Sequence, residues 1–438
     1  MPAPTHQPAM KVLVFAHVPP PHHGQSYMVQ LMLQGFGGDR RKNPAAGASP
    51  HFIECYHVDA RVSKNLEDIG DLRFGKIFLL LGFCAQALWC RFRYGVENFY
   101  FIPAPGKRSA LYRDWLVMFV CRPFFKRIIL HWHAAGLAKW LETSVQIRWR
   151  AITYRALKAA DLCIVLSNYN RADAEKLLPQ RIRIVGNGIL DPCPGFDREL
   201  QPRRRLRREL RAKLLAGQPP TAGERAEAGG DPEVFHVLYL AHCMKEKGLF
   251  DAVAGVELAN QKLAAQASPV RLQLNIAGNF ASAEDTAAFD RVLQRPEGAP
   301  HLHYLGFVGG DKKTQELRKA DLFCFPTFYQ NENQPVNLIE AMAFGLPVVT
   351  TRWRSLPEMF PPDYPGLVEI RAPEKIAEAL LSLLTSDAGE NLRRVFERDF
   401  AMASHLAGLA AAFRSIEQPL LKKPSLPPAH TANLALTP

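Results

Sequence analysis

The sequence predicts an α/β protein built from two doubly wound domains, each a parallel sheet with helices on both faces. The same opening occurs twice, at residues 11–36 and 234–263: a short apolar strand, a glycine-bearing loop and an amphipathic helix. Further strand-like segments alternate with helical patterns in both halves, which is typical of parallel sheets. These segments are 127–133, 162–167 and 182–188 in the first half and 271–279, 302–308, 321–326 and 345–351 in the second.

The length of 438 residues accommodates two such Rossmann-like domains with connecting segments. We expect the two domains to face each other across a central cleft, with the carboxyl ends of both sheets lining it. Ligands bind at this edge of a parallel sheet. We expect a final helix to pack back on the first domain. The predicted order is a disordered N-terminus (1–10), a first domain (11–190), a basic and Gly/Pro-rich linker (191–232), a second domain (233–390), the final helix (391–418) and a disordered tail (419–438).

The composition, 47% hydrophobic and 22% charged, is that of an ordinary globular protein. No apolar stretch reaches the roughly 18 residues of a spanning helix, the nearest being residues 77–90. The N-terminus lacks the apolar region of a secretory signal. The eight cysteines are scattered without a Cys-x-x-Cys pair, which indicates reduced thiols in the cytoplasm, neither a disulfide framework nor a zinc site.

The positive charge is concentrated in the first half. Residues 1–200 hold 26 Lys/Arg against 15 Asp/Glu, whereas the rest hold 28 against 27. Such asymmetry favours an anionic partner surface, and without a nucleic-acid motif we expect a membrane. Residues 77–95 and 109–127 combine apolar and aromatic residues with basic ends and could lie in a membrane interface, although core helices are the alternative. We therefore predict a cytoplasmic protein peripherally associated with the inner membrane surface.

Two glutamates eight positions apart, Glu332 and Glu340, occur in the stretch ENQPVNLIEAMAFGLPVVTT. Asn333 is expected to cap a helix and Gly345 to end it, which puts Glu332 in the preceding loop and Glu340 two turns along. A helix N-terminus favours a diphosphate, and each carboxylate oxygen can accept a hydrogen bond from one hydroxyl of a vicinal diol. A nucleotide-sugar fits this pattern; the alternative is two surface glutamates on a solvated helix.

Other strand ends of the second half carry groups suited to the same ligand. Lys247, before the helix-opening Gly248, can reach a phosphate at that helix N-terminus. His242 could add a donor, Gly278 ends a strand, and the backbone of Phe307 and Val308 could frame a base. Each signal is weak alone, but four strand ends bearing such groups in order are unlikely by chance.

Residues 234–384 resemble the nucleotide-sugar-binding domain of the retaining glycosyltransferases of family 4, which have the GT-B fold. The motifs are the Lys247-Gly248 turn, AGN at 277–279, YLGF at 304–307, KAD at 319–321 and Glu332-x7-Glu340. The resemblance implies that Glu332 contacts the transferred sugar and Glu340 the ribose hydroxyls. It also implies that Lys247 and the backbone at Asn333, Gln334, Pro335 and Val336 hold the sugar and diphosphate. One departure is His242, which stands where the family commonly has an arginine.

The first half resembles the acceptor-binding domain of this family more loosely. VPPPHHGQS resembles its glycine loop, with Gly24 approaching the ligand, and residues 187–189 resemble the Asn-Gly-Ile turn before the linker. HWHAAGL resembles the segment that carries a cleft histidine. His131 and His133 are two apart on one strand and can share a side. His133 is the better cleft candidate, and His131 is expected to be packed or supporting.

Several fingerprints are missing from the sequence. It has no Asp-x-Asp, no G-x-G-x-x-G after a strand and no P-loop, and no carboxylate or cysteine accompanies its histidine pairs at metal-ligand spacing. We therefore expect no metal and no cofactor beyond a nucleoside diphosphate-sugar as co-substrate.

The function predicted from the sequence is that of a metal-independent, retaining, hexosyltransferase-type glycosyltransferase. Its catalytic residues would be His133, Glu332 and Lys247, and its acceptor a lipid-linked sugar or polysaccharide precursor at the inner face of the membrane. The alternative is an inactive homologue that acts as a nucleotide-sugar- or lipid-binding scaffold in polysaccharide assembly.

Overall fold

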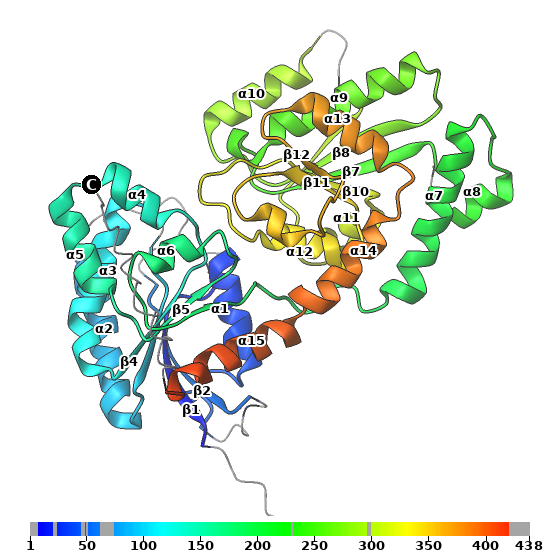
Figure 1. The fold of residues 1–438 in the computed structure, drawn as a ribbon. Coiled ribbons are helices and arrows are strands. Elements are labelled where there is room, and N and C mark those ends of the chain that lie inside the picture. Colours follow the sequence, from blue (N-terminus) through cyan, green and yellow to red (C-terminus); the bar gives the residue numbers. More distant parts are fainter. Residues whose placement is uncertain are drawn as a thin grey trace, which may run out of the picture.

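The computed structural model describes residues 8–20, 24–44, 49, 51–61, 74–104, 106–228, 231–295 and 299–419. Figure 1 shows two α/β lobes, the first coloured blue to teal and the second green to orange. Each contains a six-stranded parallel sheet with helices on both faces, so the fold class predicted from the sequence is confirmed.

The first sheet has the strand order β2-β1-β3-β4-β5-β6. Its strands are apolar and largely buried, as expected when helices cover both faces of a parallel sheet. The chain order reverses between β1 and β3, which is where doubly wound domains bind ligands. The strands are β1 (Met10–Phe15), β2 (Ile53–Val58), β3 (Asn98–Phe101), β4 (Arg127–His131), β5 (Leu162–Val165) and β6 (Ile182–Ile184).

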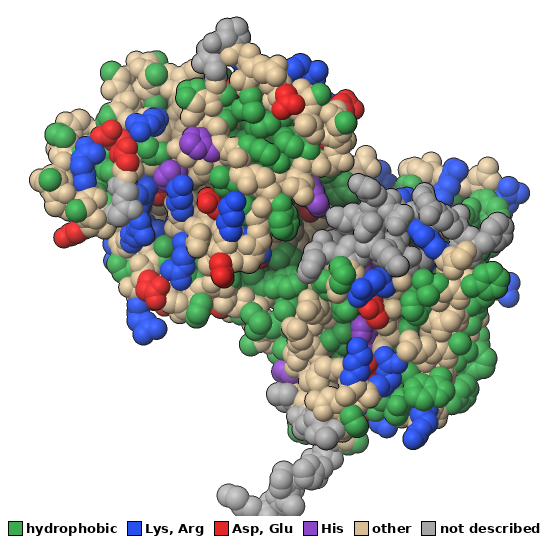
Figure 2. Space-filling model, turned by 180° about the vertical axis from the view of Figure 1, so that it is seen from behind, with side chains coloured by type: hydrophobic (Ala, Val, Ile, Leu, Met, Phe, Trp, Pro, Cys, Tyr) green, Lys and Arg blue, Asp and Glu red, His purple; other side chains and the backbone are tan. Residues whose placement is uncertain are grey.

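Two groups of helices cover this sheet. Helix α1 packs on one face, while α2, α3 and α5 form a layer on the other, the outer face of the lobe (Figure 1). Figure 2 shows, from behind, that hydrophobic side chains gather along this outer edge. The helices are α1 (Gly24–Gly35), α2 (Phe74–Tyr94), α3 (Arg108–Cys121), α4 (Leu137–Ser144), α5 (Ile147–Leu157) and α6 (Arg171–Glu175), with the short helical turn η1 (Arg122–Phe124) after α3.

The second sheet has the strand order β12-β11-β10-β7-β8-β9, that of the Rossmann fold. Its topological switch point lies between β7 and β10. The strands are β7 (Val234–Leu240), β8 (Arg271–Ala277), β9 (Leu302–Gly306), β10 (Leu322–Phe325), β11 (Val348–Thr351) and β12 (Leu367–Val368). The helices are α9 (Leu249–Ala265), α10 (Ala283–Leu293), α11 (Gly310–Lys319), α12 (Val336–Ala343), α13 (Pro373–Ser382) and α14 (Ala388–Val395), with the short turns η3 (Lys245–Lys247) and η4 (Leu356–Met359).

Helix α12 ends as the sequence predicts but begins differently. Gly345 has a φ of 60°, the left-handed conformation that suits a glycine after a helix. The predicted N-cap Asn333 was wrong, since Pro335 holds that position. The Asn333 side chain instead accepts a hydrogen bond from Ser355 Oγ at 2.9 Å, so a tertiary contact replaces the cap.

Much of the segment predicted as a linker belongs to the second domain. Helices α7 (Gln201–Leu215) and α8 (Ala222–Ala228) lie within residues 191–232, preceded by the helical turn η2 (Phe196–Leu200). The guanidinium of Arg207 donates to both oxygens of Asp321 at 3.0 Å, and Arg211 lies 4.4 Å from the ring centroid of Phe235. The linker prediction was wrong here because Arg207 and Arg211 both form buried ion pairs with Asp321, more than a hundred positions away.

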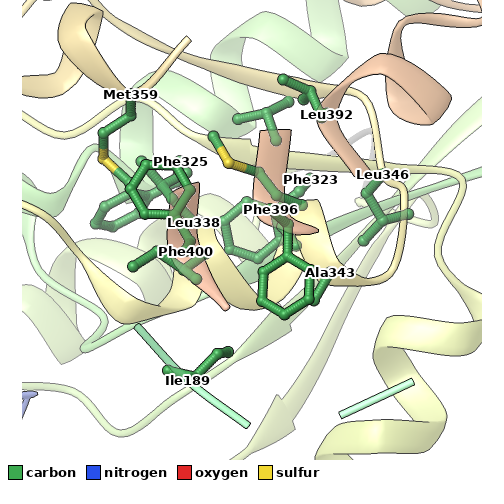
Figure 3. Close-up of a cluster of buried hydrophobic side chains, with 14 of the residues drawn as sticks. Ile189, Phe323, Phe325, Leu338, Ala343, Leu346, Met359, Leu392, Phe396 and Phe400 are labelled. Carbon is green, nitrogen blue, oxygen red and sulfur yellow. The ribbon is translucent and has the colours of Figure 1, made fainter. Parts of the chain in front are cut away.

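The chain crosses between the domains twice, and the two crossings are paired. The Ile189 amide donates to Phe400 O at 2.9 Å, and the Met402 amide donates to Ile189 O at 2.8 Å. Figure 3 places Ile189 with Phe396 and Phe400 in one cluster of buried side chains. This pairing interrupts the single final helix that we expected. The segment is α14, the turn η5 (Phe396–Phe400), α15 (Met402–Arg414) and the turn η6 (Ser415–Glu417).

After the second crossing, α15 lies against the first domain, beside α1 (Figure 1). Phe413 contacts the rings of Phe36 and Tyr100, with centroids 6.1 and 6.0 Å away. The disordered N-terminus was predicted to extend to residue 10, which is too far, because Met10 already begins β1. Residues 1–7 of that segment, and the predicted tail from residue 420 onward, lie outside the described residues.

Candidate active site

A buried ion pair lies at the switch point of the second domain. Lys247 Nζ is 2.6 Å from Glu332 Oε2, and both side chains are largely shielded from solvent. Thr327 Oγ1 also donates to this carboxylate at 3.1 Å, and Nζ lies 4.6 Å from the ring centroid of Tyr329. The structure therefore brings together two of the residues predicted to be catalytic, one from the loop after β7 and one from the loop after β10.

Backbone geometry fixes Lys247 in this place. The next residue, Gly248, has a φ of 79°, and a Cβ there would lie 2.2 Å from Pro326 O, so the α9 turn closes against the loop after β10. Tyr239 OH donates to the carbonyl of His242 at 3.0 Å and to that of Lys247 at 3.4 Å. A glycine and a buried tyrosine thus set the position of the lysine.

The N-termini of two helices approach each other beside this pair. Asn337 Nδ2, in the first turn of α12, donates to Leu240 O at the end of β7 at 2.8 Å. A Cβ on Gly24, which begins α1 in the other domain, would lie 4.0 Å from Val336. The first-turn amides of α12 have no intrahelical acceptor and attract anions. Pro335 has no N–H, so Val336 and Asn337 supply the amides.

Glu340 lies further along α12, and its partner comes from α11. Lys313 Nζ is 2.5 Å from its Oε1. Tyr27 of α1 lies close enough that burial and the charge of Glu340 raise the pKa of its hydroxyl. Lys313 and Tyr27 therefore both lie beside Glu340, and sequence reasoning missed both. The only signal was a lysine near the start of a basic helix, and nothing in that pattern pairs it with Glu340.

Gly278 follows β8, and Phe307 and Val308, which were predicted to frame a base, follow β9. Gly278 has no room for a side chain, because a Cβ there would lie 1.8 Å from Ala241 O. Its carbonyl accepts a hydrogen bond from Tyr304 OH at 3.0 Å. The Phe307 side chain is 71% exposed, whereas Val308 is buried. The Phe307 ring is therefore accessible for stacking, whereas the Val308 side chain packs in the core.

His242 stands at the exposed end of β7. Partial desolvation, together with the positive charge of Lys247, lowers the pKa of its imidazole. The side chain is therefore neutral near pH 7. Towards a diphosphate it can donate one hydrogen bond but carries no charge, unlike an arginine.

His131 ends β4 and His133 follows it two residues later, and their rings lie side by side. Their ring centroids are 4.2 Å apart. His131 is buried, its Nδ1 lies 2.6 Å from Tyr100 OH, and burial with the neighbouring histidines holds its pKa well below the usual value. His133 is half-buried after the strand, and its carbonyl accepts a hydrogen bond from Asn333 Nδ2 at 3.5 Å. His133 therefore lies against the loop that carries Glu332.

Gln334 connects the domains. Its side chain donates to Leu166 O at 2.9 Å and accepts from the Asn187 amide at 2.8 Å. Asn187 Nδ2 donates to the carbonyl of Gln334 at 2.9 Å. The side-chain amide of Gln334 is thus committed to the interdomain contact, so only the backbone of Gln334 is left to contact a nucleotide-sugar.

A metal site is not evident in the described ranges. They contain no cluster of three or more His, Cys, Asp or Glu side chains that could hold an ion.

Comparison with known proteins finds a family match in the second domain. Residues 236–386 match the model of the family described as Glycosyl transferases group 1. The amylovoran biosynthesis glycosyltransferase AmsK of Erwinia amylovora is 28% identical over 189 residues, which cover 39% of this chain. The match spans only 44% of that relative's length.

Solved structures with the same architecture match nearly the whole chain. Sucrose-phosphate synthase (tll1590) from Thermosynechococcus elongatus has a TM-score of 0.60 at 16% identity, covering 93% of this chain and 99% of that one. Anabaena Alr3699/HepE in complex with UDP-glucose has a TM-score of 0.57 at 15% identity, covering 93% and 100%. At such identities these likenesses show the fold alone. Residues 236–386 thus match the group 1 glycosyltransferase family, and the chain as a whole shares the GT-B fold of these solved structures.

Proposed function

We propose that the chain transfers a sugar from a nucleoside diphosphate-sugar to a lipid-linked sugar or polysaccharide precursor, with retention of configuration and without a metal. The observation that carries this proposal is the Lys247–Glu332 pair at the switch point, beside the N-terminus of α12. The relatives are in accord, since AmsK is named for amylovoran biosynthesis and HepE is described with UDP-glucose.

Each group has a role in holding the donor. The diphosphate lies between Lys247 and the first-turn amides of α12, where a cation and a helix N-terminus both attract it. Glu340 accepts hydrogen bonds from the ribose hydroxyls, sharing its carboxylate with Lys313. The carboxylate of Glu332 exchanges its bond with Lys247 for the hydroxyls of the transferred sugar. Opening this pair couples diphosphate binding to sugar binding.

The transfer step then runs on one face of the sugar. The bond between the anomeric carbon and the diphosphate oxygen breaks, and the acceptor hydroxyl oxygen bonds to the same carbon from the same side. The acceptor proton passes to the departing diphosphate oxygen. Lys247 stabilises the charge that develops on this leaving group, which is where a fixed cation contributes most to catalysis. His133, next to the Glu332 loop, orients the sugar or the acceptor.

Binding of the nucleotide tests the proposal first. One nucleoside diphosphate of a panel (UDP, GDP, ADP, dTDP) is expected to raise the Tm by several degrees, because a ligand at about 100 times its Kd stabilises the native state by about 2.7 kcal/mol. The effect should be unchanged by EDTA. A panel in which no nucleotide raises the Tm contradicts the donor site.

The outer helical layer of the first domain supports membrane placement. Helix α2 is longer than the apolar run 77–90 indicated, and by length and composition alone Gly75–Tyr94 could cross a membrane; only 22% of that stretch is buried. A narrow stripe including Leu80, Cys84 and Ala87 packs inward. The outer apolar face, defined by the exposed hydrophobic side chains of this layer, consists of Ile77, Phe78, Leu79, Leu81, Trp89, Phe92, Tyr112, Phe119, Phe124, Ile147 and Trp149.

This arrangement fits a helix layer lying in the interface of an anionic bilayer better than a buried core layer. Phe78 is 74% and Phe92 68% exposed, which is costly in water and favourable among acyl chains. Arg91, Arg93 and Lys126 flank the outer apolar face, as basic residues do at anionic lipid surfaces. The acceptor domain would thus be held where a lipid-linked acceptor is found.

We expect salt-sensitive binding to vesicles of phosphatidylglycerol and phosphatidylcholine. Changing Arg91, Arg93, Lys126 and Arg127 to Glu should weaken partitioning well over tenfold, because each basic residue near an anionic surface contributes about 1 kcal/mol. Vesicle flotation at low and high salt measures the fraction of protein bound to the vesicles. The matched control reverses four exposed basic residues of the second domain, Arg271, Lys312, Lys375 and Arg394, and should retain binding. Equal loss in both variants, or no binding by the wild type, would contradict membrane docking through this face.

A further inference from the structure

The loop after β11 contains an arginine in an unfavourable backbone conformation. Arg354 has a φ of 52°, in the left-handed region that side-chain-bearing residues rarely adopt. Such outliers persist only where surrounding structure enforces them, and they cluster at ligand-binding and catalytic sites. The neighbouring side chains show what holds it there.

The guanidinium of Arg354 crosses from the second domain to the first. It lies 5.4 Å from the ring centroid of Trp353 and 5.9 Å from that of Tyr169 in the first domain. A Cβ on Gly136, in the loop after β4, would lie 2.8 Å from Nη1. The absence of a side chain at Gly136, whose φ is 100°, therefore gives the guanidinium its place beside the first domain.

Two of the guanidinium nitrogens have no hydrogen-bond acceptor in the described part of the chain. Nε and Nη1 are shielded from solvent, yet no acceptor within the described residues pairs with either. The nearby carboxylate of Asp173 is already engaged, since Oδ2 accepts from the Gly136 amide at 2.8 Å and Oδ1 from the Ala138 amide at 2.7 Å. A shielded, charged donor without an acceptor is costly, so this fork is suited to an anion that arrives with a ligand.

The arginine is joined to the candidate site by hydrogen bonds. Ser355, the next residue, donates to the carbonyl of Asn333 at 2.7 Å, and Asn333 contacts the carbonyl of His133. Arg354 thus lies between two parts of the candidate site. On one side is the loop that carries Glu332, and on the other is Gly136, which follows His133 by three residues. Lys247 and the N-terminus of α12 belong to the donor side; Arg354 faces the loops of the first domain.

We propose that Arg354 binds a phosphoryl group of the acceptor, a lipid diphosphate, through its Nε and Nη1 fork. The planar guanidinium matches two phosphate oxygens at once, which an ammonium group does not. This inference rests on the proposed function, and it names the chemical class of the acceptor. The residue holds the acceptor by its phosphoryl group, while the attacking hydroxyl lies towards Glu332 and the donor sugar.

Arg354→Gly separates a binding role from a structural one. Glycine adopts a φ of 52° without strain, so the Tm should be retained within a few degrees. Farnesyl diphosphate serves as a soluble probe of the acceptor, and calorimetry with the donor site saturated by the nucleotide that stabilises the wild type measures its Kd. Binding of farnesyl diphosphate should weaken about tenfold to a hundredfold, as expected when a bond between charged groups is lost. The Kd of the nucleotide alone should change less than twofold.

The matched control is Arg352→Gly in the same loop, which should bind both probes like the wild type. Its exposed side chain lies 3.9 Å from Glu369, and its amide bond to Val368 O is kept by a glycine. Farnesol, which lacks phosphate, should not distinguish Arg354→Gly from the wild type. Equal weakening of nucleotide binding would assign Arg354 to the donor diphosphate and overturn the proposal. Unchanged farnesyl diphosphate binding, or none by the wild type, overturns it as well. In the last two cases intact nucleotide binding leaves the proposed function standing.

Discussion

Lys247→Ala is expected to lower kcat for the nucleotide-sugar about 10²- to 10³-fold, the usual loss when one fixed group that stabilises developing charge is removed. Lys247 is shielded from solvent beside Glu332 and Tyr329, so water does not replace its charge at the leaving diphosphate. Initial rates of nucleoside diphosphate release measure the effect. Lys245→Ala, in the same short turn but exposed, is the matched control and should retain wild-type rates.

The same assay tests the metal-free mechanism. The proposed mechanism draws its positive potential from the lysine and the N-terminus of α12, so EDTA should leave the wild-type rate unchanged. Activity that EDTA abolishes and magnesium restores would overturn this part of the account. A Lys247→Ala variant with the wild-type rate would remove the lysine from the mechanism.

The two glutamates are expected to separate nucleotide binding from sugar transfer. Glu340→Ala should weaken the affinity for the free nucleoside diphosphate about tenfold to a hundredfold, because a hydrogen bond to a charged group is worth about 1.5–3 kcal/mol. Glu332→Ala should bind the nucleotide as tightly as the wild type or slightly better, because Lys247 no longer has a competing carboxylate. The turnover of Glu332→Ala should fall sharply, since the hydroxyls of the transferred sugar lose the carboxylate that accepts their hydrogen bonds.

Calorimetry with the nucleotide, followed by steady-state kinetics, measures both effects. Glu246→Ala, an exposed glutamate next to Lys247, is the control and should behave as the wild type. If both variants changed only the Tm, the pair would be structural and the donor assignment wrong. A Glu332→Ala protein with full turnover would likewise exclude contact with the transferred sugar.

Local sequence signals predicted the framework of the site well. The helix stop at Gly345, the following buried strand and the glycine turn before α9 all follow from short-range backbone preferences. The repeated strand-loop-helix opening predicted two doubly wound domains, and parallel strands bring their carboxyl ends to one edge. Hence Lys247 and Glu332, 85 residues apart in sequence, could be expected in one place.

Contacts between distant side chains were beyond such reasoning. The pairing of Glu340 with Lys313 and the approach of Tyr27 depend on how two domains meet, for which no local pattern exists. Asn333 was expected to cap its helix, but Ser355 and the first domain take its hydrogen bonds. Gln334 likewise connects the domains, although its position in the motif indicates a ligand contact.

Charge composition misled the reading of residues 191–232. A run of arginines is typical of a solvated segment, but in α7 several of them are buried against Asp321 and Phe235. The break in the final helix also has a tertiary cause, because the Phe400 carbonyl and the Met402 amide pair with Ile189 at the crossing. Both errors concern how the domains are joined, and neither moves the candidate site.

The central claim is that a nucleoside diphosphate-sugar bound at Lys247, Glu332 and Glu340 gives up its sugar to a lipid acceptor. The most direct measurement incubates the wild type and Lys247→Ala with a panel of nucleotide-sugars and a bacterial lipid extract in EDTA, and follows products by mass spectrometry. The account predicts that the wild type consumes one donor, releases its nucleoside diphosphate and adds one sugar mass to a phosphorylated lipid, and that Lys247→Ala does so at least a hundredfold more slowly. Tight nucleotide-sugar binding with no transferred sugar in any combination would contradict it and make the chain a binding scaffold.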